Sequence, residues 1–84
     1  MTYELVITRR AEKDIARLDP VAKQRVKEAL QEYLKDPLRH ARKLLELSLG
    51  TYRFRIGDYR VIFDLEGDKL VVLRVGHRRE IYRS

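Results

Sequence analysis

The chain has 84 residues, enough for one domain with a modest core, and its 19 lysines and arginines against 13 acids give a net charge of +6. This balance favours a nucleic acid or an acidic protein as partner over an acidic small substrate. Cysteine is absent, which excludes disulfides and thiolate chemistry. The sequence has neither a signal-peptide pattern nor an apolar run near the ~20 residues of a membrane span, so we expect a cytoplasmic protein.

The first third of the chain predicts a strand followed by two helices. Residues 3–7 have the alternation of a strand, and Thr8 is a plausible N-cap for a helix whose apolar residues recur at helical spacing. Asp19 and Pro20 then restart a helix, because aspartate caps and proline fits the first helical position. Asp36, which precedes a proline, ends this second helix. Helices joined so tightly should pack as an antiparallel hairpin.

The segment 38–49 is ambiguous, because its leucines do not all fit one face of a helix. We interpret it as a basic loop, pinned by leucines, that leads into a sheet.

The last third predicts a meander of antiparallel strands. Residues 52–56 place aromatic and aliphatic side chains on one face and arginines on the other, and Gly57-Asp58 suits a two-residue type II′ turn. This register sets Arg55 directly opposite Arg60. The segment 70–75 is apolar on both faces, as expected of an interior strand. We therefore predict a single α+β domain over residues 1–84: an N-terminal strand, a helical hairpin, then a mainly antiparallel meander of three to four strands.

Arginines gather on the polar face of this predicted sheet. Arg53, Arg55 and Arg60 share that face, and like charges directly across a strand pair are destabilising by a few tenths of a kcal/mol. A solvated face whose arginines pair with Asp64 or Glu66 would explain one such residue. For three of them, binding of a phosphate is the better interpretation, because guanidinium presents a planar fork of donors matched to phosphate.

A second basic cluster follows the last strand, where Gly76 lets the chain bend. It comprises His77, Arg78 and Arg79, with Tyr82 close behind. Tyrosine can stack on a base or exchange a proton, although a terminal tyrosine is more often a core plug. Two histidines without cysteine give no recognisable metal site, and no Walker or Rossmann glycine loop, activated serine or carboxylate pair is present.

The two motifs GTYRFRIGDYRVIF (residues 50–63) and LRVGHRREIY (residues 73–82) together resemble the RelE branch of the RelE/ParE toxin superfamily, and the match covers essentially the whole chain. The resemblance implies a type II toxin that cuts mRNA in the ribosomal A site without metal or other cofactor, by attack of the ribose 2′-hydroxyl on the adjacent phosphate. It also implies the ribosome, mRNA and a RelB-like antitoxin as partners.

The resemblance assigns roles to particular residues of this sequence. The catalytic positions are Arg53, Arg55, Arg60, Arg78 and Tyr82. Arg60 and Arg78 would hold the scissile phosphate, Tyr82 would stack on a base or help proton transfer, and Arg53 would orient the backbone with Arg55 beside it. Further nucleic-acid contacts are expected from Arg42, Lys43 and Arg79.

Arg53 and Arg55 stand where some relatives have lysine, and arginine essentially cannot lose its proton. Either His77 or Tyr82 transfers the proton, or catalysis rests on positioning and charge neutralisation. Two other interpretations stay open: a ParE-like toxin that poisons DNA gyrase, and a catalytically weak relative that binds RNA or its antitoxin without cutting.

Overall fold

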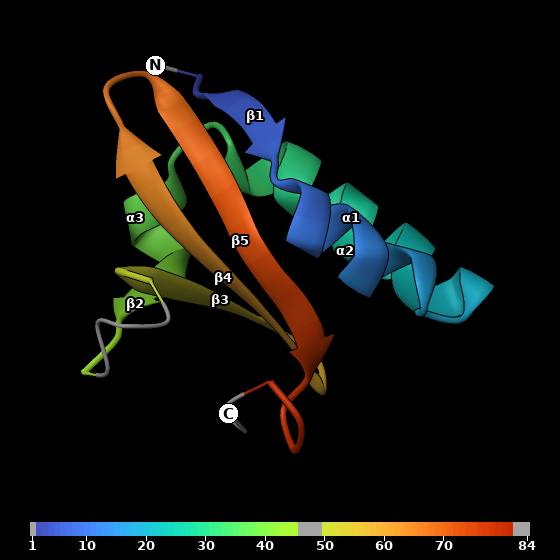
Figure 1. Cartoon of the computed structure of the whole chain (residues 1–84). Coiled ribbons are helices and arrows are strands. Elements are labelled where there is room, and N and C mark those ends of the chain that lie inside the picture. Colours follow the sequence, from blue (N-terminus) through green and yellow to red (C-terminus); the bar gives the residue numbers. More distant parts are fainter. Residues whose placement is uncertain (1, 46–49, 82–84) are drawn as a thin grey trace.

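One twisted sheet with two helices packed against one of its faces makes up the molecule, a computed structural model that describes residues 2–45 and 50–81 (Figure 1). Within these residues the elements are β1 (Glu4–Ile7), α1 (Arg9–Ala16), α2 (Pro20–Tyr33), α3 (Pro37–His40), β2 (Ala41–Lys43), β3 (Tyr52–Ile56), β4 (Tyr59–Glu66) and β5 (Lys69–His77). The described strands lie in the order β1-β5-β4-β3-β2. Strand β1 pairs parallel to β5, and the other pairs are antiparallel, which confirms the predicted α+β fold and its meander.

The two long helices begin where the caps predict. The Thr8 hydroxyl accepts a hydrogen bond from the Ala11 N–H, and the Asp19 carboxylate accepts one from the Ala22 N–H, with Pro20 as the first residue of α2. Helix α2 runs back in the direction opposite to α1 (Figure 1), as the predicted hairpin requires. The hydrophobic core lies between the helices and one face of the sheet. Its buried residues are Ala11, Val26, Leu30, Leu34, Phe54, Ile56, Val61, Phe63, Leu70, Val72 and Val75.

The β3–β4 turn has the predicted geometry. Gly57 has φ +60°, whereas no non-glycine residue of the described chain has positive φ, so only the first turn residue is left-handed, as in a type II′ turn. Ile56 pairs with Tyr59, and Arg55 pairs with Arg60. The predicted register of this hairpin is therefore confirmed.

The predicted loop over 38–49 is wrong for its first half. Pro37–His40 forms a single helical turn, and Ala41–Lys43 forms the edge strand β2, in which Ala41 pairs with Phe54. Helix α2 ends at Tyr33, before the predicted end at Asp36, and Pro37 fits the first position of the new turn. The His40 ring stacks on the Tyr33 ring with 4.2 Å between their centroids. The pairing of Ala41 with Phe54 joins residues far apart in the sequence, so local pattern did not indicate the strand. Residues 46–49 lie outside the described part of the chain.

A β-bulge between β4 and β5 shifts the alternation of β5, so that after it the other set of β5 side chains faces the helices. Ile62 pairs with Arg74 and Phe63 pairs with Val72, which leaves Leu73 as the extra residue. Val72 and Val75 therefore both face the helices, although they are three residues apart. Arg74 consequently points to the opposite face of the sheet. No helix in the described residues is long and apolar enough to cross a membrane.

Candidate nucleic-acid interface

The sheet face away from the helices carries a two-row array of arginines, which we call the arginine face. Its members are Arg42, Arg53, Arg55, Arg60 and Arg74. The first row crosses four strands: Arg42 of β2 pairs with Arg53 of β3, and Arg53 pairs with Ile62 of β4. Ile62 in turn pairs with Arg74 of β5. The second row sets Arg55 against Arg60, with Gly76 beyond. Because residues directly opposite share a face, five arginine positions from four strands lie on one side of the sheet, although the Arg74 guanidinium pairs with Asp14 of α1.

The arginines of β2 and β3 are not neutralised by the acids that a solvated face would use. In residues 2–45 and 50–81, no carboxylate lies within ion-pair distance of Arg42, Arg53 or Arg55. Asp64, a candidate partner, instead accepts a hydrogen bond of 2.7 Å from the Thr51 N–H. Three cations on one face therefore remain available to an anion.

Arg60 differs from its neighbours because it is buried. Only 7% of its surface is exposed, and it is the one buried charged residue of the described chain. Its Nη1 donates to the carbonyl oxygens of Gly57 and Tyr59, both at 2.9 Å. The guanidinium thus braces the β3–β4 turn, and it has five N–H donors in total for such contacts.

Arg78 reaches the same turn from the segment that follows β5. Its backbone N–H donates to the Asp58 carbonyl oxygen at 2.7 Å, and its Nε lies 3.8 Å from an Asp58 carboxylate oxygen. The segment closes on itself because Glu80 and Ile81 both donate to the His77 carbonyl, and Ile81 is buried. Half of the Arg78 side chain stays exposed, so it can bind an anion beside the turn that Arg60 braces. Tyr82 lies outside the described residues.

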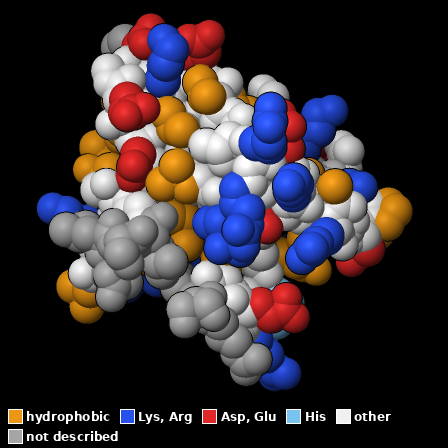
Figure 2. Space-filling model, viewed as in Figure 1, with side chains coloured by type: hydrophobic (Ala, Val, Ile, Leu, Met, Phe, Trp, Pro, Cys, Tyr) orange, Lys and Arg blue, Asp and Glu red, His pale blue; other side chains and the backbone are white. Residues whose placement is uncertain are grey.

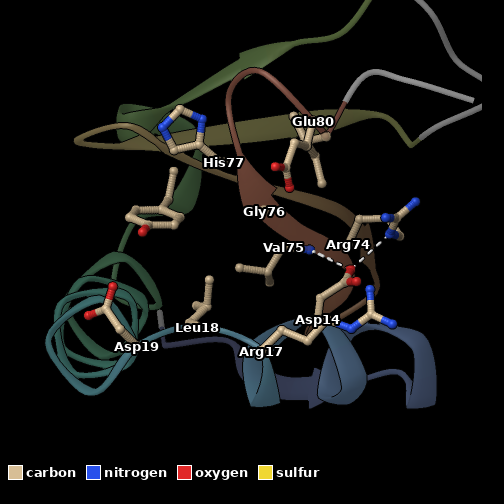
Figure 3. Close-up of a pocket in the computed structure, with 11 residues that line it drawn as sticks. Asp14, Arg17, Leu18, Asp19, Arg74, Val75, Gly76, His77 and Glu80 are labelled. Atoms are coloured by element: carbon tan, nitrogen blue, oxygen red, sulfur yellow. Dashed lines mark hydrogen bonds and ion pairs between the residues drawn. The ribbon is translucent and has the colours of Figure 1, made fainter.

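His77 lies on the helix side of the sheet rather than with the arginines. It pairs with Tyr59, a residue that packs on the core, and the two rings meet edge to face at 5.8 Å. Its Nδ1 accepts a hydrogen bond from the Arg79 N–H at 3.2 Å. It lines a pocket of about 440 Å³ opposite Leu18 and Asp19 of the α1–α2 junction (Figure 3). This position separates its imidazole from the arginine face.

The remaining predicted contacts divide between the two faces. Arg42 belongs to the arginine face, whereas Lys43 pairs with Tyr52 and so points to the helix side at the edge of the sheet. Arg79 is exposed in the turn after β5. Arg74 was not predicted as a site residue, because the bulge that turns it to the arginine face leaves no local sequence signal.

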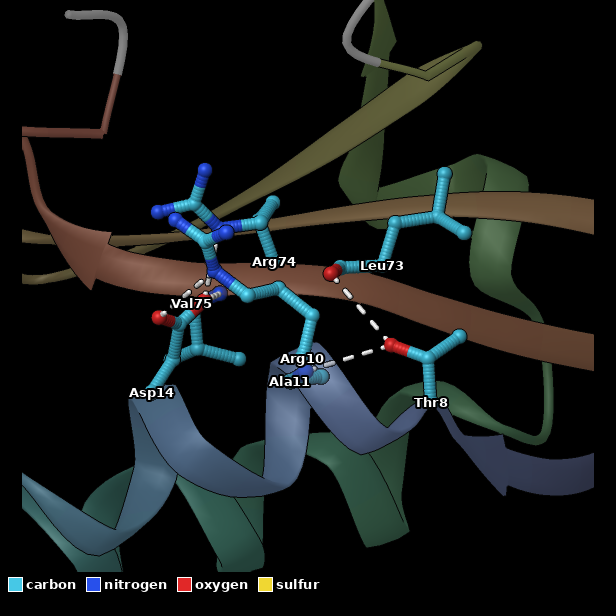
Figure 4. Close-up of polar contacts among 7 residues, drawn as sticks. All are labelled: Thr8, Arg10, Ala11, Asp14, Leu73, Arg74 and Val75. Atoms are coloured by element: carbon cyan, nitrogen blue, oxygen red, sulfur yellow. Dashed lines mark hydrogen bonds and ion pairs between the residues drawn. The ribbon is translucent and has the colours of Figure 1, made fainter. Parts of the chain in front are cut away.

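An aspartate of α1 anchors the part of β5 that leads to Arg78. Strand β1 ends opposite Val72, so the following β5 residues have no strand on that side. Asp14 fills the gap: one carboxylate oxygen accepts from the Val75 N–H at 3.0 Å and from Arg74 Nε at 2.8 Å (Figure 4). The Thr8 hydroxyl also donates to the Leu73 carbonyl at 3.4 Å. In the sequence, Asp14 looked like an ordinary acid on a helix surface.

Charge is unevenly distributed over the molecule. In Figure 2, lysine and arginine side chains gather over α1 and the C-terminal half of β5, and acidic side chains lie near the β4–β5 turn. There the carboxylates of Glu4 and Asp68 raise the pKa of Lys69 above its usual value of 10.5. The described residues contain no group of three or more histidine, cysteine or acidic side chains that could hold a metal ion.

The sequence and structure are similar to those of known toxins. Residues 5–82 match the family model for the ParE toxin of the type II toxin–antitoxin system parDE. Toxin RelG of Mycobacterium tuberculosis is 36% identical over 86 residues, covering 99% of both chains. A chain of the toxin–antitoxin complex RelBE2 from the same organism superposes with a TM-score of 0.83 and 31% identity over 93% of this chain and all of that one. A chain of the RelE–RelB complex of Pyrococcus horikoshii superposes with a TM-score of 0.76 and 26% identity, over 95% of this chain and 99% of that one.

Proposed function

This chain belongs to the RelE/ParE superfamily of type II toxin–antitoxin toxins, with relatives from the RelE branch, and from that premise we propose that it is a ribosome-dependent endoribonuclease. It would cut mRNA in the ribosomal A site and so inhibit translation. The observation that carries the proposal is the arginine face, on which Arg42, Arg53 and Arg55 have no carboxylate partner among the described residues. Such a face suits the closely spaced phosphates of a single RNA strand.

In the proposed reaction the ribose 2′-hydroxyl gives up its proton and attacks the adjacent phosphate. The P–O5′ bond breaks, which leaves a 2′,3′-cyclic phosphate, and the leaving 5′-oxygen takes up a proton. Arg53 and Arg55 bind the RNA backbone along β3. Arg78 contacts the scissile phosphate, because its side chain is half exposed beside the β3–β4 turn. A donor placed where transition-state charge develops is worth about 3 kcal/mol. The scheme requires no metal or other cofactor.

Arg60 would contribute to this reaction mainly through the turn. Its Nη1 already donates to two turn carbonyls, and Arg78 binds the Asp58 backbone in the same turn. The buried guanidinium therefore helps to fix the position of Arg78, and its positive charge adds to the potential at the phosphate.

Cleavage would depend more on how the arginines position the phosphate and the attacking 2′-hydroxyl than on a strong general base. An arginine keeps its proton at physiological pH, so Arg53 and Arg55 cannot act as the base. His77 faces the helices and its Nδ1 is engaged by Arg79, which does not favour it for this role. Tyr82 remains the proposed residue for base stacking or proton transfer, one residue beyond the buried Ile81.

We further propose a RelB-like antitoxin as the cognate partner, with action in the cytoplasm. The similar structures from M. tuberculosis and P. horikoshii are of toxin–antitoxin complexes, and a basic surface suits an acidic or amphipathic inhibitor segment. The match to the ParE family model keeps gyrase poisoning as the second candidate function.

The test is cleavage of a defined mRNA with and without programmed ribosomes, with the cut mapped by primer extension. A cut in the A-site codon that requires ribosomes, and that disappears when the nucleotide before the cut lacks its 2′-hydroxyl, is the expected result. Growth arrest without any cut would redirect the proposal to gyrase. Neither arrest nor cleavage would identify a catalytically weak relative.

A further inference from the structure

The two-residue β3–β4 turn is surrounded by arginines from three separate elements. The Arg60 guanidinium of β4 donates to the Gly57 carbonyl, whereas Arg78 donates to the Asp58 carbonyl with its backbone N–H and has its Nε 3.8 Å from the Asp58 carboxylate. The third is Arg25 of α2, which the sequence analysis did not single out. A Cβ built on Gly57 would lie 3.0, 3.5 and 3.6 Å from Nη2, Cζ and Nη1 of Arg25. The Arg25 guanidinium therefore occupies the space beside Gly57 that a side chain at this position would need.

Arg25 lies beside the turn without being neutralised there. No carboxylate lies within ion-pair distance of Arg25 in residues 2–45 and 50–81, and its side chain is exposed. Arg25 therefore presents a positive charge at the tip of the hairpin.

The local charge balance points to the ligand. Arg25 and Arg78 approach a turn whose acid, Asp58, is 3.8 Å from Arg78 Nε in an exposed pair. The two positive charges repel each other, and an exposed ion pair offsets little of that repulsion. A phosphate group would relieve it, and Arg55, two residues before Gly57, extends the positive surface onto the arginine face.

We propose that Arg25 is a further RNA-binding residue, which contacts a backbone phosphate of the bound strand at the tip of the β3–β4 hairpin. The inference rests on the proposed function for the identity of the ligand as single-stranded RNA. It extends the nucleic-acid interface from the sheet onto helix α2. The strand would then cross the arginine face and pass over the turn, with Arg25 binding a phosphate next to the one that Arg78 contacts.

The experiment measures binding of a fluorescent RNA, with 2′-O-methyl groups throughout to prevent cleavage, by anisotropy over a series of salt concentrations. We compare Arg25→Ala with Lys27→Ala, which removes the same charge from the same helix. Lys27 lines a surface hollow with Gln31 and Glu32 that includes no residue of the β3–β4 turn. Arg25→Lys keeps the charge but loses the planar group, and thermal unfolding of each variant checks its folding.

We expect Arg25→Ala to weaken binding about 5-fold and to reduce the slope of log affinity against log salt by about 0.7, as loss of one phosphate contact predicts. Lys27→Ala should change affinity less than about 2-fold, and Arg25→Lys should be intermediate. Equal effects of the Arg25→Ala and Lys27→Ala substitutions would overturn the inference, as would no binding by the unmodified chain at low salt. Failure of the proposed function is distinguishable, because it would appear as absent ribosome-dependent cleavage by the unmodified chain.

Discussion

Asp14→Ala should destabilise the fold more than any other single change on the surface of α1. The Asp14 side chain is only 10% exposed and accepts hydrogen bonds from Arg74 Nε and the Val75 N–H. Loss of a hydrogen bond to a charged group costs about 1.5–3 kcal/mol, and a backbone N–H left without a partner costs about 1–3 kcal/mol. The Arg10 contact at 3.8 Å is exposed and adds little. Because such terms are not additive, we expect a loss of about 3 kcal/mol.

Urea unfolding measures this loss directly, with the free energy extrapolated to water and the slope expected to stay unchanged. Asp14→Asn separates the two contributions, because its amide oxygen can still accept from Val75 while the charge that pairs with Arg74 is lost. We expect it to cost about 1 kcal/mol. Glu12→Ala, on the exposed side of the same helix, should cost about 0.5 kcal/mol or less. The reasoning is refuted if Asp14→Ala is no more destabilising than Glu12→Ala.

Four further substitutions test other parts of the structure. Arg78→Ala and Tyr82→Phe should each relieve growth arrest while leaving circular dichroism and antitoxin binding unchanged; undiminished toxicity in both would contradict the site assignment. Arg60→Met should destabilise the protein by about 2 kcal/mol in urea unfolding, because the buried guanidinium braces the turn carbonyls; a neutral effect would contradict that bracing role. Glu4→Gln should lower the pKa of Lys69 toward 10.5, as NMR titration would detect, because the carboxylate raises it; with that raised pKa, the stabilisation is present below about pH 10.5 and is lost as pH rises through the folded-state value.

Local sequence rules were sufficient for the elements that local chemistry determines. The caps at Thr8 and Asp19 located both helix starts, and the Gly57-Asp58 turn gave the β3–β4 register that pairs Arg55 with Arg60. In each case the determining residues lie within a few positions of one another. The predicted concentration of arginines on one sheet face followed from that register alone.

Features that depend on distant partners could not be predicted in the same way. The bulge opposite Ile62 turns Arg74 toward the arginine face, and the short strand β2 exists because Ala41 finds Phe54 as its neighbour. The same limit applies to His77, whose closeness in sequence to Arg78 suggested a shared site. Alternation along β5 instead places its ring against Tyr59 on the helix side.

The most direct test of the account compares cleavage on programmed ribosomes by two doubly substituted chains. Arg53→Ala/Arg55→Ala removes two charges from the arginine face, and Lys23→Ala/Lys27→Ala removes two from the exposed surface of α2. We expect the rate of A-site cleavage to fall at least about 100-fold in the first chain and less than about 3-fold in the second. Equal losses in both chains, or an unchanged rate in the first, would contradict the claim that the arginine face binds the mRNA for cleavage.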